Sequence, residues 1–179
     1  MLELFTDIVI ISDSGKDPEV ISLKNDKISV INGKIPSIPK ELERPQGIRL
    51  PNGDLLLSGG QKCKNGSAIH GCSEKYLIHK KWSNEWIEVG KMMLPRQNHA
   101  SILMNGVLYS CGGWDSSEYE ETISHHEAFN LSEHEVKEMK NMPIALDGHT
   151  ATKIDDNKYL IAGGRGNDVS VISIKVFDT

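Results

Sequence analysis

One pattern occurs three times in this sequence: an apolar run that ends in a pair of glycines. The runs are DLLLSGG at 54–60, VLYSCGG at 107–113 and YLIAGG at 159–164. Their first glycines, at 59, 112 and 163, are 53 and 51 residues apart. A nearly fixed period of about fifty residues is typical of stacked supersecondary units, each of which buries its apolar face against its neighbours. The repeat therefore predicts a chain of several similar units.

The residues around each glycine doublet predict antiparallel strands. Asn and Gly stand before the first two runs, at 52–53 and 105–106, and both tolerate the positive φ of a tight hairpin turn. Upstream, His99 and His149 begin segments that we interpret as innermost strands. Downstream, segments interpreted as third strands each carry an aromatic residue: Tyr76, Phe129 and Phe177. We expect these rings to pack between neighbouring units.

The repeat unit as a whole resembles a known family. A fourth strand is predicted around Trp86 and, at the equivalent position of the next unit, around Val136. The motif Met-x-x-Pro-Arg-x-x-His follows at 92–99. The order of apolar run, Gly-Gly, aromatic residue, Trp and this motif resembles the kelch repeat, most clearly from 75 to 113. The resemblance implies four-stranded antiparallel blades of a β-propeller.

The chain departs from the kelch pattern at several positions. The expected Trp is kept only at Trp86, whereas Val136 and Ile28 replace it elsewhere, and Asp147 or its neighbours stand where Arg is usual. Near the amino end, Asp7–Ser12 occupies the place of a doublet strand but has no glycine pair. We interpret this first unit as a degenerate blade.

We therefore predict an all-β fold of kelch-type blades, about three and a half in number, in a single domain over residues 1–179. The predicted units are a degenerate blade at 1–40, two blades at 41–93 and 94–143, and an incomplete blade at 144–179. Propellers normally close with four to eight blades. An incomplete or open propeller has unpaired edges, which favour self-association. A piece of a longer propeller is the alternative.

Composition limits the expected partners. The chain has 25 acidic and 20 basic residues and no basic cluster interleaved with aromatic rings, which argues against nucleic-acid binding. The apolar run Ile8–Ile11 is too short to span a membrane and lacks the flanks of a signal peptide. Three cysteines, an odd count, suit a reducing compartment. We expect a cytoplasmic protein with no nucleic-acid or membrane partner.

The candidate chemical motifs favour structural interpretations. Zn²⁺ binds Cys and His, but the spacing of Cys63, His70, Cys72 and His79 matches no zinc finger or knuckle. We interpret this run as polar residues of a loop between the second and third strands, followed by a strand histidine. His125 and the adjacent His126 would point to opposite faces of a strand, and neighbouring histidines rarely bind one ion. We predict no catalytic residue, no metal and no cofactor.

The remaining polar candidates lie in loops that a propeller gathers on one face around its channel. Arg can grip a carboxylate through two parallel hydrogen bonds and Trp is a large anchor, and both are enriched at binding hot spots. The candidates in the interblade loops are Arg44, Arg96, Gln97, Asn98 and Asp147. The candidates after the doublets are Gln61, Trp114, Asp115, Arg165, Asn167 and Asp168.

The kelch resemblance implies a protein–protein interaction module that binds a partner peptide on this loop face. Its finer form is the substrate-recognition part of a cullin-type ubiquitin-ligase adaptor, although Met1–Leu50 does not resemble the BTB domain that such adaptors carry. The alternative is an enzyme on the same fold, such as a sugar epimerase or mutarotase, with acid/base groups in the channel. Fold alone does not establish function, and the sequence leaves the partner's identity and the number of blades open.

Overall fold

The computed structural model describes residues 7–10, 19–24, 27–32, 37–64, 67–81, 83–116, 121–166 and 174–178. Every regular element in these ranges is a β-strand, and all the paired strands are antiparallel. The all-β prediction is confirmed. None of the described residues forms a helix that is long and apolar enough to cross a membrane.

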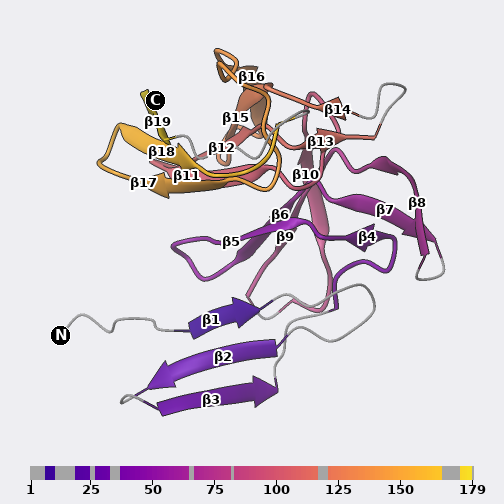
Figure 1. Cartoon of the computed structure of the whole chain (residues 1–179). Helices are drawn as coiled ribbons and strands as arrows, with labels where there is room; N and C mark the ends of the chain where they lie inside the picture. The colour runs from indigo at the N-terminus through magenta and orange to yellow at the C-terminus, as the bar shows by residue number, and fades with distance from the viewer. Residues whose placement is uncertain are drawn as a thin grey trace.

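Two four-stranded sheets form the centre of the structure, and we call them blade A and blade B (Figure 1). Blade A has the order β10-β9-β6-β5, with β5 at Gln46–Arg49, β6 at Leu55–Ser58, β9 at Lys75–His79 and β10 at Ile87–Lys91. Blade B has the order β11-β12-β15-β16, with β11 at Ala100–Met104, β12 at Val107–Cys111, β15 at His126–Asn130 and β16 at Glu135–Glu138. The predicted succession of four strands around each doublet is thus observed twice.

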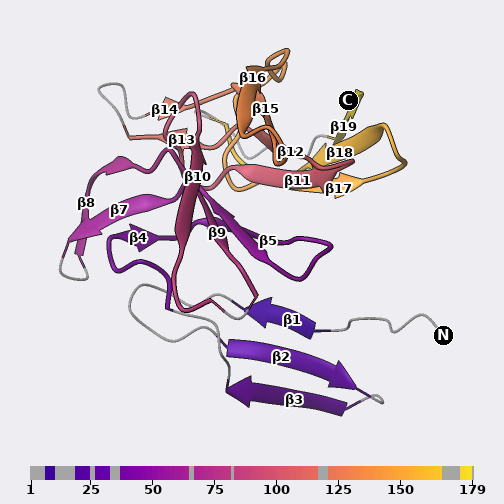
Figure 2. The same ribbon diagram turned by 180° about the vertical axis from the view of Figure 1, so that it is seen from behind.

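Three-stranded sheets lie on either side of this pair. Blade C, after blade B, comprises β17 at Thr150–Lys153, β18 at Lys158–Ala162 and β19 at Ile174–Asp178. The amino-terminal sheet comprises β1 at Asp7–Ile10, β2 at Glu19–Lys24 and β3 at Lys27–Asn32. Figures 1 and 2 both place this sheet on the opposite side of blade A from blade C. The exact unit boundaries and the assignment of one domain remain predictions.

Two small sheets follow the doublets of blades A and B. One contains β4 at Leu42–Glu43, β7 at Gln61–Lys64 and β8 at Ser67–Cys72, and the other contains β13 at Trp114–Asp115 and β14 at Glu121–Thr122. Both extend to the same side of the blades in Figures 1 and 2. The interpretation of the segment after the first doublet as a polar loop is therefore wrong. Cys63 and Cys72 are 3% and 2% exposed, and the Cys63 thiol donates to the Lys40 carbonyl.

The core lies between the blades, because each central strand presents side chains to both neighbours. Leu108 belongs to the cluster between blades A and B, whereas the next residue, Tyr109, belongs to the cluster between blades B and C. Tyr76 and Phe129 stack with ring centroids 4.2 Å apart and planes inclined by 5°. Such a pair contributes about 0.5–1.5 kcal/mol beyond its area burial. The prediction that these two rings pack between units is confirmed.

Candidate functional site

The residue after each doublet is paired with the interblade loop of its own blade. Trp114 forms an isolated antiparallel bridge with Gln97, and Arg165 forms the same bridge with Asp147. In blade A, β7 and β4 place Gln61 opposite Glu43. Because the pairing recurs in every blade, Gln61, Trp114 and Arg165 are equivalent positions. The structure therefore arranges them as a series along the loop face.

The next residue of each interblade loop has a left-handed backbone. The φ angles are +51° at Arg44, +53° at Asn98 and +64° at Gly148. Gly and Asn adopt this region readily, whereas it is strained for Arg. The Gly148 amide donates to the Asn98 carbonyl at 2.8 Å, which connects the loops that precede blades B and C. Arg44 is exposed and Asn98 is half-buried.

The glycine doublets let the interblade loop of the following blade approach closely. A Cβ added at Gly112 would lie 2.5 Å from the Leu146 carbonyl oxygen and 2.6 Å from the His149 ring. At Gly59 it would overlap the Arg96 carbonyl oxygen and lie 2.7 Å from the His99 ring. These two glycines therefore have the same role at successive interfaces, which only a residue without a Cβ can fill.

The second glycine of the first two doublets supplies a backbone donor to the same loop. The Gly60 amide donates to the Arg96 carbonyl and the Gly113 amide to the Leu146 carbonyl, both at 2.8 Å. At the third doublet, a Cβ on Gly163 would have nothing within 4 Å among the described residues. In the described part of the chain, no interblade loop therefore covers Gly163 of blade C.

Arg165 is the candidate that is best prepared to contact a partner. Its Nε lies 2.8 Å from Asp147 Oδ1 and its Nη2 3.1 Å from Oδ2, while its side chain is 71% exposed. Asp147 is only 1% exposed. The hydrogen bonds that Arg165 donates to Asp147 raise the pKa of Arg165, so the guanidinium stays charged. A buried carboxylate therefore orients an exposed cation on the loop face.

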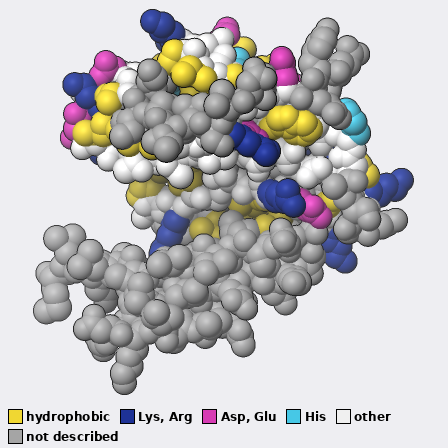
Figure 3. Space-filling model, viewed as in Figure 1, with side chains coloured by type: hydrophobic (Ala, Val, Ile, Leu, Met, Phe, Trp, Pro, Cys, Tyr) yellow, Lys and Arg dark blue, Asp and Glu magenta, His cyan; other side chains and the backbone are white. Residues whose placement is uncertain are grey.

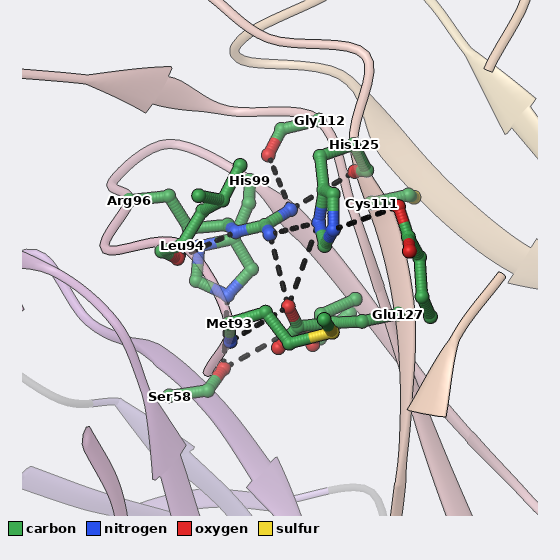
Figure 4. Close-up of polar contacts among 12 residues, drawn as sticks. Ser58, Met93, Leu94, Arg96, His99, Cys111, Gly112, His125 and Glu127 are labelled. Carbon is green, nitrogen blue, oxygen red and sulfur yellow. Dashed lines mark hydrogen bonds and ion pairs between the residues drawn. The ribbon is translucent and has the colours of Figure 1, made fainter. Parts of the chain in front are cut away.

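Arg96 lies in the interior and not on the loop face (Figure 4). Its side chain is fully buried, and it donates from Nη1 to the carbonyls of Gly112 and His125 at 3.1 and 2.9 Å. Nη2 lies 2.6 Å from His125 Nδ1 and 3.1 Å from Glu127 Oε2. The expectation that Arg96 is an exposed loop residue is wrong, because these acceptors draw its guanidinium between the blades.

Glu127 completes this buried charge pair. Its Oε1 accepts from the Tyr76 hydroxyl of blade A at 2.8 Å, and its Oε2 accepts from the Met93 amide at 3.1 Å. Burial raises the pKa of Glu127, and Arg96 and the hydrogen bonds to Tyr76, Met93 and Leu94 oppose that rise. Glu127 was not among the sequence candidates, although a Glu beside Ala128 and Phe129 in a predicted strand was a signal that it has a buried partner.

The remaining candidates are distributed as follows. Trp114 and Asp115 are half-buried and Gln97 is 6% exposed, so the paired backbone holds Gln97 beneath the face while Trp114 stays partly accessible. Asn167 and Asp168 lie outside the described residues. Partner binding by any of these side chains remains a prediction. Acidic and basic side chains are interspersed on the view of Figure 3 and do not form a patch of one sign.

The Cys and His residues are built into the fold. In the ranges that the structure describes, no group of three or more His, Cys, Asp or Glu side chains is placed to hold a metal ion. His125 faces Arg96, whereas the adjacent His126 faces Tyr159, with His126 Nε2 2.6 Å from the Tyr159 hydroxyl oxygen. The prediction that these two histidines point in opposite directions is confirmed.

Successive antiparallel sheets pack face to face, and the doublets of blades A and B lie against the loop of the next blade. This arrangement defines a β-propeller-type repeat protein. The family model of the kelch motif matches residues 95–143, which contain blade B. This match supports the resemblance to kelch repeats that the sequence shows.

Two groups of curated proteins are similar to most of the chain. A protein of Arabidopsis thaliana that carries the name F-box/kelch-repeat protein is 29% identical over 136 residues, which are 72% of this chain and 38% of that protein. Kelch-like protein 15 of Homo sapiens is 25% identical over 163 residues, 88% of this chain and 26% of that protein. Kelch-like protein 15 of Gallus gallus is 26% identical over 161 residues. The chain therefore corresponds to between about a quarter and two fifths of the length of these relatives.

Proposed function

We propose that this protein-interaction module binds a partner peptide on the loop face, through the series Gln61, Trp114 and Arg165. The observation that carries the proposal is the Asp147–Arg165 pair, in which a carboxylate that is 1% exposed holds a guanidinium whose side chain is 71% exposed. Preorganised cations lose little side-chain freedom when they bind. The same backbone bridge presents Trp114 one blade earlier.

The chemistry of these positions favours a peptide with an acidic side chain beside an apolar one. Asp147 uses Nε and Nη2 of Arg165, and Nη1 takes no part in that pair. A partner carboxylate at Nη1 would form a charge-assisted hydrogen bond. Trp114 is half-buried, so its ring can cover an apolar side chain without first having to be ordered.

A random peptide library displayed on phage provides the test. Peptides selected by the purified chain should bind at least tenfold more weakly to Arg165→Ala and to Trp114→Ala. Lys158→Ala, an exposed change on β18, is the matched control and should bind like the unmodified chain. Selected peptides that bind the Arg165 and Trp114 variants at full affinity would show that the face is elsewhere.

We further propose that the module acts without catalysis, as the substrate-recognition part of a cytoplasmic ubiquitin-ligase adaptor. The kelch repeats and the similarity to F-box/kelch and Kelch-like proteins support this proposal. The test is affinity capture of the protein from cells with and without Arg165→Ala, with quantification of a cullin scaffold and of ubiquitin-modified partners. The variant should keep the scaffold and lose the partners. Fluorescence of a tagged chain tests its place in the cell.

In the described part of the chain nothing covers Gly163 of blade C, which supports self-association through the blade edge. Its counterpart Gly112 is covered by Leu146 and His149, and the strand residue before Gly112, Cys111, is 1% exposed. Ala162, at the equivalent position of blade C, is half-buried. Light scattering should give the mass of a discrete oligomer, and Ala162→Arg should return the monomer of 19.9 kDa. A monomeric unmodified chain would contradict the proposal.

A further inference from the structure

His125 and His126 are adjacent in the chain and serve the two faces of blade B. Both are buried, with exposures of 9% and 2%. His125 is directed to the interface with blade A, where it contacts Arg96, and His126 is directed to the interface with blade C, where it contacts Tyr159. Each blade interface therefore contains one member of a histidine pair.

The contacts of His125 require the neutral imidazole. Arg96 is a donor only and lies 2.6 Å from Nδ1, so this nitrogen must accept the hydrogen bond and carry no proton (Figure 4). Protonation would remove the acceptor and place a second cation beside the guanidinium. Two carboxylates favour the protonated ring instead. Glu127 Oε2 lies 3.5 Å from Nδ1, and Glu138 Oε1 lies 3.9 Å from Nε2.

The contacts of His126 also suit the neutral ring. Nδ1 lies 3.2 Å from the Lys140 carbonyl oxygen, which can only accept, so Nδ1 carries the proton. Nε2 is then free to accept from the Tyr159 hydroxyl at 2.6 Å. The aromatic rings of Tyr109 and Tyr159 lie nearby, with centroids 6.2 and 6.0 Å from that of His126. A proton on Nε2 would reverse this hydrogen bond, because the Tyr159 hydroxyl oxygen can also accept, and would place a positive charge on a side chain that is 2% exposed.

The electrostatic surroundings agree with this geometry. Burial lowers the pKa of His125 and Arg96 lowers it further, with Glu138 opposing. Burial also lowers the pKa of His126, the hydrogen bond to Lys140 opposes this, and the neighbouring His125 and Arg96 lower it further. Both rings are therefore neutral at neutral pH and take up protons only in acid.

We propose that the two blade interfaces form an acid-sensitive joint, in which protonation of His125 loosens blade A from blade B and protonation of His126 loosens blade B from blade C, while the strands inside each blade stay paired. The interblade loops would move with the joint, because the Arg96 carbonyl holds the Gly60 amide and Gln97 pairs with Trp114. The consequence for partner binding rests on the proposed function, but the joint itself does not.

Hydrogen exchange of the full chain tests the joint without any partner. The amides of Gly60 and Gly113 donate across the two interfaces, and those of β12 and β15 donate within blade B. Protection factors, corrected for the intrinsic rate, are compared at about pH 7.5 and about pH 5.5, on either side of the ordinary histidine pKa of about 6.5. We expect Gly60 and Gly113 to lose at least tenfold more protection in acid than the β12 and β15 amides.

Variants assign the effect to the two histidines. In His125→Asn the amide oxygen can still accept from Arg96, and the acid loss at Gly60 should shrink while that at Gly113 persists. In His126→Gln the reverse is expected. His134→Asn is the control, because His134 is exposed, has a φ of +58° that Asn tolerates, and should keep the full response.

Three outcomes would overturn the proposal. The first is equal acid sensitivity of interface and within-blade amides in the unmodified chain. The second is a full acid response in a chain that carries both His125→Asn and His126→Gln, which would assign the effect to Glu127, His99 or His149. If the variants do not fold, NMR titration of the unmodified chain decides: histidine midpoints that differ from the midpoint of interface exchange exclude the joint. Failure of peptide binding alone leaves these readouts unchanged.

Discussion

The Arg96 guanidinium lies 3.1 Å from the Glu127 carboxylate, and both side chains are fully buried. Arg96 comes from the loop between blades A and B, and Glu127 comes from β15 of blade B. Because Glu127 also accepts from Tyr76 of blade A, the pair contributes to the contact between the two blades. Removing one charge of such a pair leaves the other buried without compensation.

Arg96→Met should therefore destabilise the protein by about 3–5 kcal/mol, as expected for a broken buried pair. The measurement is urea unfolding followed by circular dichroism. Lys91→Met is the control, because the Lys91 side chain is 60% exposed and its ion pair with Glu74 is superficial. A loss for Arg96→Met no larger than that of the control would contradict the structural role of the pair.

Alanine substitutions at Gly112 and Gly163 should differ in cost, although both glycines have positive φ, +60° and +73°. The left-handed backbone costs alanine about 1–2 kcal/mol at either position. At Gly112 the new Cβ would also meet the Leu146 carbonyl and the His149 ring, whereas at Gly163 it would meet no described atom within 4 Å. We expect Gly112→Ala to cost about 1–3 kcal/mol more than Gly163→Ala in urea unfolding.

Equal costs at these two glycines would have a clear meaning. Either the loop before blade C yields to the new methyl group, or the Gly163 face is covered by a partner under the conditions of the experiment. Repeating the measurement at several protein concentrations separates the two, because a cover supplied by a second copy makes stability depend on concentration.

Tyr76→Phe should cost about 1.5–3 kcal/mol, because it removes a donor to the buried Glu127 carboxylate and leaves the stacked ring in place. Tyr109→Phe removes a hydroxyl in the other interface cluster, away from Glu127, and should cost less. Thermal and urea unfolding of both variants give the comparison. The reverse order would show that the Tyr76 hydroxyl contributes little to holding the blades.

Stability should decrease as the pH falls below the ordinary histidine value. Four buried histidines, His99, His125, His126 and His149, have lowered pKa values, with burial as the first cause in each. A folded-state pKa below the unfolded one means that the unfolded chain binds more protons, so stability is present above about pH 6.5 and is lost in acid. The raised pKa of Glu127 means that the folded chain binds this proton more readily than the unfolded chain, so at lower pH Glu127 opposes the loss of stability.

The slope can reach about 1.4 kcal/mol per pH unit for each histidine that protonates on unfolding. Urea midpoints at about pH 7.5, 6.5 and 5.5 measure it, above the range where most carboxylates titrate. A midpoint that is constant across these values would show that the histidines are accessible to protons in the folded chain.

The repeat could be predicted from the sequence because the residues that define it act locally. The doublets, the hairpin turns and the aromatic residues at 76 and 129 each depend on backbone freedom or on alternation along one strand, and both are visible in a single unit. The burial of individual polar side chains was harder to predict. Arg96 and Arg165 have the same side chain and both follow loop motifs, yet one is fully buried and the other is 71% exposed.

The sequence by itself determined the all-β class and the kelch-type strand order, because a period of about fifty residues and turn residues at repeated positions are properties of the chain. Only the tertiary structure decided which polar residues face solvent. Glu127 and the carbonyls of Gly112 and His125 come from another part of the repeat, and together they supply the acceptors that make burial of Arg96 favourable. Asp147 instead binds its cation at the surface, because Arg165 lies directly across its backbone bridge.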